Sequence, residues 1–243
     1  MNTLRTWLFK ILFVPATILW SAFIVCLIVL PFPLRLRLAF GWGYTTIWLA
    51  RLIVGIKWQI HGLDKMPQGA CVLMVNHQST WETAFLPNLK LRQVWVLKKE
   101  LMMLPFFGWA LAVLRPVPID RKQKRQAMQK VIEEGRQRIE SGYSVILFPE
   151  GTRAPADAPL PFKLGAARLA AALGVPAVPV AHNAGQFWPK RGLMHPGTVQ
   201  VVVGAPIDPA GKTVAEINAA AERWVNDTRA RLVAAEKTRR GEA

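Results

Sequence analysis

Residues 70–77 read Ala70-Cys71-Val72-Leu73-Met74-Val75-Asn76-His77, a wholly apolar run that ends in two polar side chains. Short apolar runs bounded by Gly, Pro or polar residues are typical of strands buried on both faces of a sheet. Because α/β proteins place their sites at strand ends, the run predicts a buried strand and makes His77 a candidate functional residue.

Similar runs recur along the chain, and helical patterns alternate with them. In Gln123–Ser141 the apolar residues fall on one helical face, and Thr213 with Glu216 forms a capping box before a final helix. This alternation predicts an α/β fold with a mixed, largely parallel sheet flanked by helices. The other predicted strands are Lys57–His61, Gln93–Leu97, Val117–Ile119, Ser144–Phe148, Ala177–Val180 and Val199–Val203.

The N-terminal region carries two apolar stretches. No charged residue occurs from Ile11 to Leu34, and at about 1.5 Å per helical residue this run is long enough to cross a bilayer core of about 30 Å. A weaker stretch, Leu38–Ile56, contains Arg51, and Pro31 with Pro33 breaks the two apart. A single span and a helix pair dipping into one leaflet both fit this pattern.

Positive charges flank the first stretch on both sides, so its orientation stays open: Arg5 and Lys10 precede it, and Arg35 and Arg37 follow it. A cleaved signal peptide fits poorly, because the run is too long and no Ala-x-Ala site closes it. We therefore divide the chain into a membrane element over residues 1–55 and one α/β domain over residues 56–243, which includes the C-terminal helix.

Composition favours anionic lipid partners. Lys and Arg outnumber Asp and Glu by 31 to 15, a formal net charge of +16, while 52% of residues are apolar and ten are Trp. Dispersed basic residues beside so much apolar surface argue against a nucleic-acid partner and for acidic lipid head groups or phosphorylated substrates. Cys26 and Cys71 are isolated, so we expect no disulfide and no metal site, and a catalytic part that faces the cytoplasm.

The segment Asn76–Glu82 offers a histidine with a carboxylate five residues later. A neutral imidazole can take a proton from an attacking alcohol, and a carboxylate on its other ring nitrogen would fix the tautomer. This arrangement requires His77 in a loop and Glu82 in the first turns of the next helix. Alternatively, Ser79 and Glu82 form a capping box, in which Glu82 would bind backbone instead of His77.

A second candidate segment, Phe148-Pro149-Glu150-Gly151-Thr152-Arg153, follows another predicted strand. Gly151 permits close approach of a ligand to the backbone, and the Arg153 guanidinium matches phosphate oxygens. Ile119-Asp120-Arg121 ends a further strand and supplies a second arginine. A polar turn and a surface ion pair are the plain structural alternatives for these two segments.

These segments and Val175–Val180 occur in the order of the four motifs of the glycerolipid acyltransferase family, which the chain resembles over roughly residues 57–205. The resemblance implies a glycerol-3-phosphate acyltransferase-like fold and transfer from an acyl thioester to the sn-2 hydroxyl of 1-acyl-sn-glycerol-3-phosphate, giving phosphatidic acid. It implies His77 as general base with Glu82 as orienting acid, Arg121 and Arg153 on the phosphate, and Glu150, Gly151 and Thr152 around the acceptor.

The same resemblance implies acyl-CoA or an acyl-acyl carrier protein as donor, no cofactor, and a bacterial inner-membrane location. The chain departs from the family pattern at Glu82, where Asp is usual, and at Arg115 and Pro118 beside the second motif. The departures leave acceptor identity open, so a lyso-ornithine lipid or another lysophospholipid is an alternative acceptor. A catalytically silent protein that binds anionic membranes is the alternative from a different class.

Overall fold

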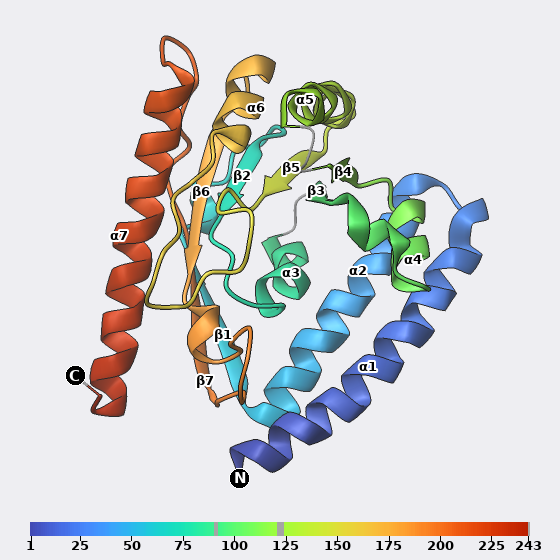
Figure 1. Ribbon diagram of the computed structural model, residues 1–243, viewed down its shortest axis with the longest axis vertical. Helices are drawn as coiled ribbons and strands as arrows, with labels where there is room; N and C mark the ends of the chain where they lie inside the picture. Colours follow the sequence, from blue (N-terminus) through green and yellow to red (C-terminus); the bar gives the residue numbers. More distant parts are fainter. Residues whose placement is uncertain (90–91, 121–123, 243) are drawn as a thin grey trace.

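The computed structural model describes residues 1–89, 92–120 and 124–242, in which one seven-stranded sheet lies between two layers of helices (Figure 1). The strands are β1 (Ile56–His61), β2 (Val72–Val75), β3 (Gln93–Lys98), β4 (Val117–Ile119), β5 (Ser144–Leu147), β6 (Ala177–His182) and β7 (Gly197–Val203). Their order is β1-β7-β6-β2-β5-β3-β4, and only the β6–β7 pair is antiparallel among these neighbours. The predicted α/β class with a mixed, largely parallel sheet is confirmed.

Helices cover both faces of this sheet. The α-helices are α1 (Asn2–Cys26), α2 (Phe32–Leu49), α3 (Trp81–Phe85), α4 (Phe107–Val113), α5 (Lys124–Glu140), α6 (Gly165–Leu173) and α7 (Val214–Arg240). Shorter helical segments are η1 (Leu27–Val29), η2 (Ala50–Val54), η3 (Leu63–Lys65), η4 (Leu86–Leu89), η5 (Lys99–Met103) and η6 (Ala184–Gln186). In Figure 1, α5, α6 and α7 lie on one face of the sheet, and α1 to α4 lie on the other.

The central strand β2 divides the core into two parts, because its successive side chains point to opposite faces. Leu73 and Val75 pack in a buried cluster that contains Trp81 of α3. Val72 and Met74 belong to a second cluster, which includes side chains of α6 and α7. All four residues of β2 are fully buried, as the unbroken apolar run predicts.

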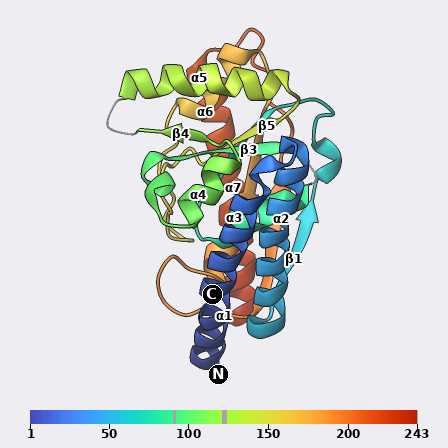
Figure 2. The same cartoon turned by 90° about the vertical axis from the view of Figure 1, so that its right-hand side faces the viewer.

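The N-terminal element is a pair of antiparallel helices, α1 and α2, which lie side by side (Figure 2). Pro31 stands at the N-cap of α2 and Pro33 within its first turn, so the predicted break between the apolar stretches occurs at the prolines. The helical stretch Asn2–Val29 is long and apolar enough to cross a membrane. Large apolar side chains on its outer surface are exposed, including those of Leu4, Trp7, Leu8, Ile11, Leu12, Ile18, Leu19 and Phe23.

One residue that the sequence suggests as a charged flank of the membrane stretch is instead part of the folded interior. Arg35 is buried, its Nη1 donates a hydrogen bond to the carbonyl oxygen of Ile28 at 2.8 Å, and its guanidinium lies 5.7 Å from the centre of the Phe32 ring. The turn between α1 and α2 leaves carbonyl groups without helical partners, and the arginine satisfies one of them. Arg35 therefore helps to hold the turn between α1 and α2 in place.

Candidate active site

The loop that carries His77 starts at the carboxyl end of β2 and is fixed there by Asn76. The Asn76 amide Nδ2 donates to the carbonyl oxygen of His182 at 3.0 Å, and the His182 N–H donates to Asn76 Oδ1 at 2.9 Å. The His182 ring also bonds to the Asn76 carbonyl oxygen through Nε2 at 2.7 Å. These buried contacts join the ends of β2 and β6. They therefore fix the direction of the backbone at the start of the loop that carries His77.

The segment around Glu150 holds the backbone of His77 from the other side. The His77 N–H donates to Glu150 Oε2 at 3.2 Å, and the Ala154 N–H donates to the His77 carbonyl oxygen at 2.8 Å. The His77 ring stacks on Phe148, with ring centres 4.1 Å apart and an interplanar angle of 18°. The two segments that the sequence singles out thus lie together, with side chain and backbone of His77 both supported.

The carboxylate of Glu82 orients the His77 ring. Its Oε1 lies 2.7 Å from His77 Nδ1, and the carboxylate can only accept, so Nδ1 carries the proton and Nε2 is free to accept one. Burial alone would raise the pKa of Glu82, but the neighbouring His182, together with the hydrogen bond and the charge of His77, lowers it to about 2. Glu82 is therefore charged at neutral pH.

Glu82 also binds backbone groups just before its own helix, so backbone binding and the contact with His77 coexist; the N-cap of α3 is Thr80, without a side-chain cap hydrogen bond, so the predicted capping box with Ser79 as N-cap is not formed. The same Oε1 accepts the backbone N–H groups of Gln78 and Ser79, each at 2.7 Å, and the Ser79 hydroxyl donates to Oε2. Ser79 Oγ in turn accepts the Trp81 N–H at 2.9 Å. His77 lies in the loop and Glu82 in the first turn of α3, which is the arrangement that the five-residue spacing requires.

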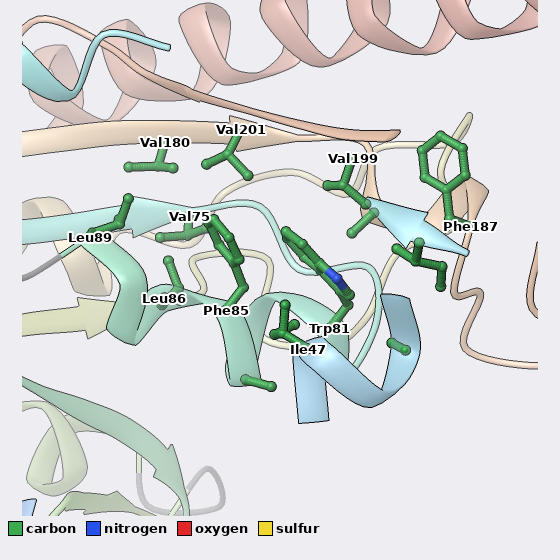
Figure 3. Packing of buried hydrophobic residues seen from close by; sticks show 14 of the residues in the cluster. Ile47, Val75, Trp81, Phe85, Leu86, Leu89, Val180, Phe187, Val199 and Val201 are labelled. Atoms are coloured by element: carbon green, nitrogen blue, oxygen red, sulfur yellow. The ribbon is translucent and has the colours of Figure 1, made fainter. Parts of the chain in front are cut away.

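Packing of α3 holds Glu82 in place. The rings of Trp81 and Phe85 stack with centres 4.3 Å apart, and both are almost completely buried against the strands (Figure 3). On its other side α3 meets α2 so closely that a side chain at Gly43 would collide with the carbonyl oxygen of Ala84. The membrane-element helix α2 therefore helps to position the carboxylate that orients His77.

Glu150 does not face the open site. Its side chain is 3% exposed, it is not among the residues that line the cavity described below, and its Oε1 is buried without a partner among the described residues. Burial raises the pKa of Glu150 to about 8, although the hydrogen bond from His77 and the charge of Arg229 oppose this shift. The structure therefore places Glu150 behind His77, as a support for its backbone.

This raised pKa makes the stability of the protein depend on pH. Glu150 ionises near 4.5 when unfolded and near 8 when folded, so its contribution is complete below about pH 4.5 and is lost as pH rises to about 8. Glu150→Gln cannot ionise, so we expect its melting temperature relative to the unsubstituted protein to increase from pH 5 to pH 8. Melting curves across this range test the prediction, with the exposed Glu133→Gln as control. A constant difference would contradict it.

The other predicted acceptor-binding residues occupy different surroundings. Gly151, with φ of +73°, and Arg153 line a cavity together with His77. Thr152 is exposed and is not among the lining residues, and Arg121 lies outside the described residues. Asp120, which precedes it, does line the cavity. The structure therefore brings His77, Gly151 and Arg153 to one space.

This cavity has a volume of about 1100 Å³ and is bounded largely by apolar side chains from helices. The sequence-based reasoning missed that the N-terminal helices form part of its wall, because nothing in their composition shows which face turns inward. It also missed the structural role of His182. The helix side chains in the wall include Phe13, Trp20, Ile24, Leu36, Ala39, Phe40, Phe107, Ala110 and Leu111.

Comparison with known proteins identifies the family of this chain. The acyltransferase family model matches residues 57–183, a range that includes β1 to β6 and both candidate motifs. The chain therefore belongs to the acyltransferase family and is an enzyme of that class, as the ordered motifs predict. It is 41% identical over 238 residues to a 1-acyl-sn-glycerol-3-phosphate acyltransferase of Pseudomonas aeruginosa, covering 95% of this chain and 92% of that protein.

More distant relatives share the name and the fold. The 1-acyl-sn-glycerol-3-phosphate acyltransferase of Escherichia coli is 32% identical over 146 residues, which are 60% of either chain. The crystal structure of the 1-acyl-sn-glycerophosphate acyltransferase of Thermotoga maritima superposes with a TM-score of 0.74 at 22% identity, covering 95% of this chain and 98% of that one. At that identity the likeness establishes the fold.

Proposed function

We propose that this acyltransferase moves an acyl group from an acyl thioester to the sn-2 hydroxyl of 1-acyl-sn-glycerol-3-phosphate, giving phosphatidic acid. One observation carries the proposal: His77 lines the cavity while its Nδ1 is held 2.7 Å from the charged Glu82. The free Nε2 is then the proton acceptor at the substrate. The name of the Pseudomonas aeruginosa relative supports the choice of acceptor.

In the proposed reaction the acceptor hydroxyl oxygen attacks the thioester carbonyl carbon while its proton passes to His77 Nε2. Glu82 stabilises the imidazolium that forms. The C–S bond then breaks, and the departing thiolate receives the proton from His77. The thioester is already activated, so no acyl-enzyme is needed, and much of the rate enhancement comes from holding the hydroxyl beside the thioester.

The acceptor phosphate requires cations near His77, and Arg153 meets this requirement from the cavity wall. We assign it to the phosphate, together with Arg121, whose position the structure does not describe. Gly151 allows the acceptor to approach the backbone closely. The carboxyl group of Glu150 accepts the His77 N–H and does not line the cavity. Glu150 therefore contributes to the reaction indirectly, by supporting the backbone of His77.

The apolar cavity between the helices supplies the environment that an acyl chain needs. Acyl-CoA or an acyl-acyl carrier protein would deliver this chain, and no further cofactor enters the reaction. The exposed apolar surface of α1 and the net charge of +16 suit a protein attached to an anionic membrane. We place the enzyme at the bacterial inner membrane, with the site facing the cytoplasm, where thioester donors are made.

An acceptor panel tests the proposed substrate. Purified enzyme with labelled acyl-CoA should acylate 1-acyl-sn-glycerol-3-phosphate and should use a phosphate-free monoacylglycerol poorly. Arg153→Met should raise KM for the phosphate-bearing acceptor roughly 10- to 100-fold, because it removes a charge-assisted hydrogen bond. Replacing acyl-CoA by an acyl-acyl carrier protein in the same assay identifies the donor. Equal use of both acceptors by the unsubstituted enzyme would refute the phosphate-anchoring role.

A further inference from the structure

Lys163, twelve residues after Gly151, lies beside the candidate segment Phe148–Arg153. After β5 the chain turns at Gly151, whose N–H donates to the Phe148 carbonyl oxygen at 2.9 Å. It then makes a long loop and comes back beside this turn, where the Lys163 N–H donates to the Pro149 carbonyl oxygen at 2.9 Å. The backbone of Lys163 is thus fixed against the motif.

The side chain of Lys163 occupies the space that the missing side chain of Gly151 leaves. Its Nζ lies 2.8 Å from the position that a β-carbon on Gly151 would take. Lys163, Gly151, Arg153 and His77 all line the same cavity. The ammonium group therefore lies over the glycine, in the wall of the cavity that the proposed base also lines.

Within the part of the chain that the structure describes, the ammonium group of Lys163 forms no ion pair with a carboxylate, although Asp120 lines the same cavity. Arg153 likewise has no carboxylate within ion-pair distance among the described residues. Lys98, which lines the same cavity, differs because it pairs with Glu100 at 3.2 Å. Two unpaired cations beside one histidine make a local positive potential that attracts an anion.

We infer that Lys163 is a specificity-determining residue that binds the phosphate of the acceptor jointly with Arg153. This inference rests on the proposed function and adds to it a ligand from outside the candidate motifs. A phosphate monoester carries about −1.5 to −2 charges at neutral pH and offers three acceptor oxygens, so an ammonium group can bind it beside the guanidinium of Arg153. Gly151 serves this arrangement, because any larger residue would push the ammonium group away.

The phosphates of an acyl-CoA donor are a second source of the same chemistry. The position of Nζ over Gly151, on the motif that also bonds to the His77 backbone, favours the acceptor, since its hydroxyl must reach His77. The experiment therefore measures KM for both substrates. The variants are Lys163→Met, Lys163→Arg, which restores the charge, and Lys237→Met, an exposed lysine on α7 that does not line the cavity.

We expect Lys163→Met to raise KM for 1-acyl-sn-glycerol-3-phosphate about 10- to 100-fold, with a much smaller change in kcat and in KM for acyl-CoA. Lys163→Arg should recover most of the loss, and Lys237→Met should behave as the unsubstituted enzyme. An unchanged acceptor KM, an increase confined to acyl-CoA, or a failure of arginine to rescue would each overturn the inference. If the unsubstituted enzyme itself does not acylate this acceptor, the proposed function fails, which is a different result.

Discussion

Replacing His77 with alanine is expected to lower turnover roughly 10²- to 10⁴-fold, the usual range for loss of a general base. The reason is specific to this site. Glu82 holds the proton on Nδ1, so Nε2 is available to take the hydroxyl proton in the cavity. Alanine removes that acceptor, and acyl transfer would then depend on proximity of the two substrates alone.

Turnover and melting temperature should be measured together, because the His77 ring also stacks on Phe148. His61→Ala is a suitable control: His61 is exposed on β1 and bonds only to Gln200 among the described residues. The His77→Ala protein should still bind anionic vesicles, since the apolar surface of α1 is unchanged. If His77→Ala kept full turnover, His77 would not be the general base.

The central strands β2, β5 and β6 could be predicted because strands buried on both faces are nearly continuous apolar runs in the sequence. The run Ala70–Val75 has no polar residue, and β2 is completely buried between helices of both layers. The break at Pro31 was predictable for a similar local reason, since proline cannot continue the preceding helix. Features that depend on a few neighbouring residues can thus be predicted from the sequence before the fold is known.

Contacts between distant segments were not predictable in this way. Lys163 contacts Gly151 because the loop between them folds back to the place where it begins. Arg35 points into the protein, toward a carbonyl group at the turn between α1 and α2. The support that Glu150 gives to His77 joins residues 73 positions apart. The order of the motifs in the sequence marked these segments as candidate site segments. It could not show which atom of Glu150 contacts which partner, because that depends on how the loops pack.

Glu82 illustrates the limit of local pattern most clearly. From the sequence it was either a backbone-binding member of a capping box or the partner of His77, and one oxygen atom proves to bind both backbone N–H groups and the imidazole. A carboxylate that accepts several donors is held in a single orientation, so these backbone contacts aim the oxygen at the imidazole.

Substituting Glu82 with glutamine separates these two roles. The glutamine carbonyl oxygen can replace Oε1 and still accept the N–H groups of Gln78 and Ser79, so these backbone contacts survive. The charge that stabilises the imidazolium does not survive. We expect kcat to fall between about 10²- and 10⁴-fold, by analogy with the loss of the orienting carboxylate in a catalytic triad. The melting temperature should also fall near neutral pH, because a Glu82 pKa lowered to about 2 means that the ionised carboxylate stabilises the fold, so kcat is measured below the melting transition of the variant.

The chain contains a matched control for this experiment. Glu216 also accepts a backbone N–H, that of Thr213, in a capping box at the start of α7, away from the cavity. Glu216→Gln should leave kcat unchanged, because this exposed glutamate makes its capping contacts away from the cavity. If both variants kept normal kcat, the contact with His77 would be a by-product of backbone binding, and the orienting role of Glu82 would be wrong. A loss confined to Glu82→Gln means that the charge beside His77 matters for the reaction.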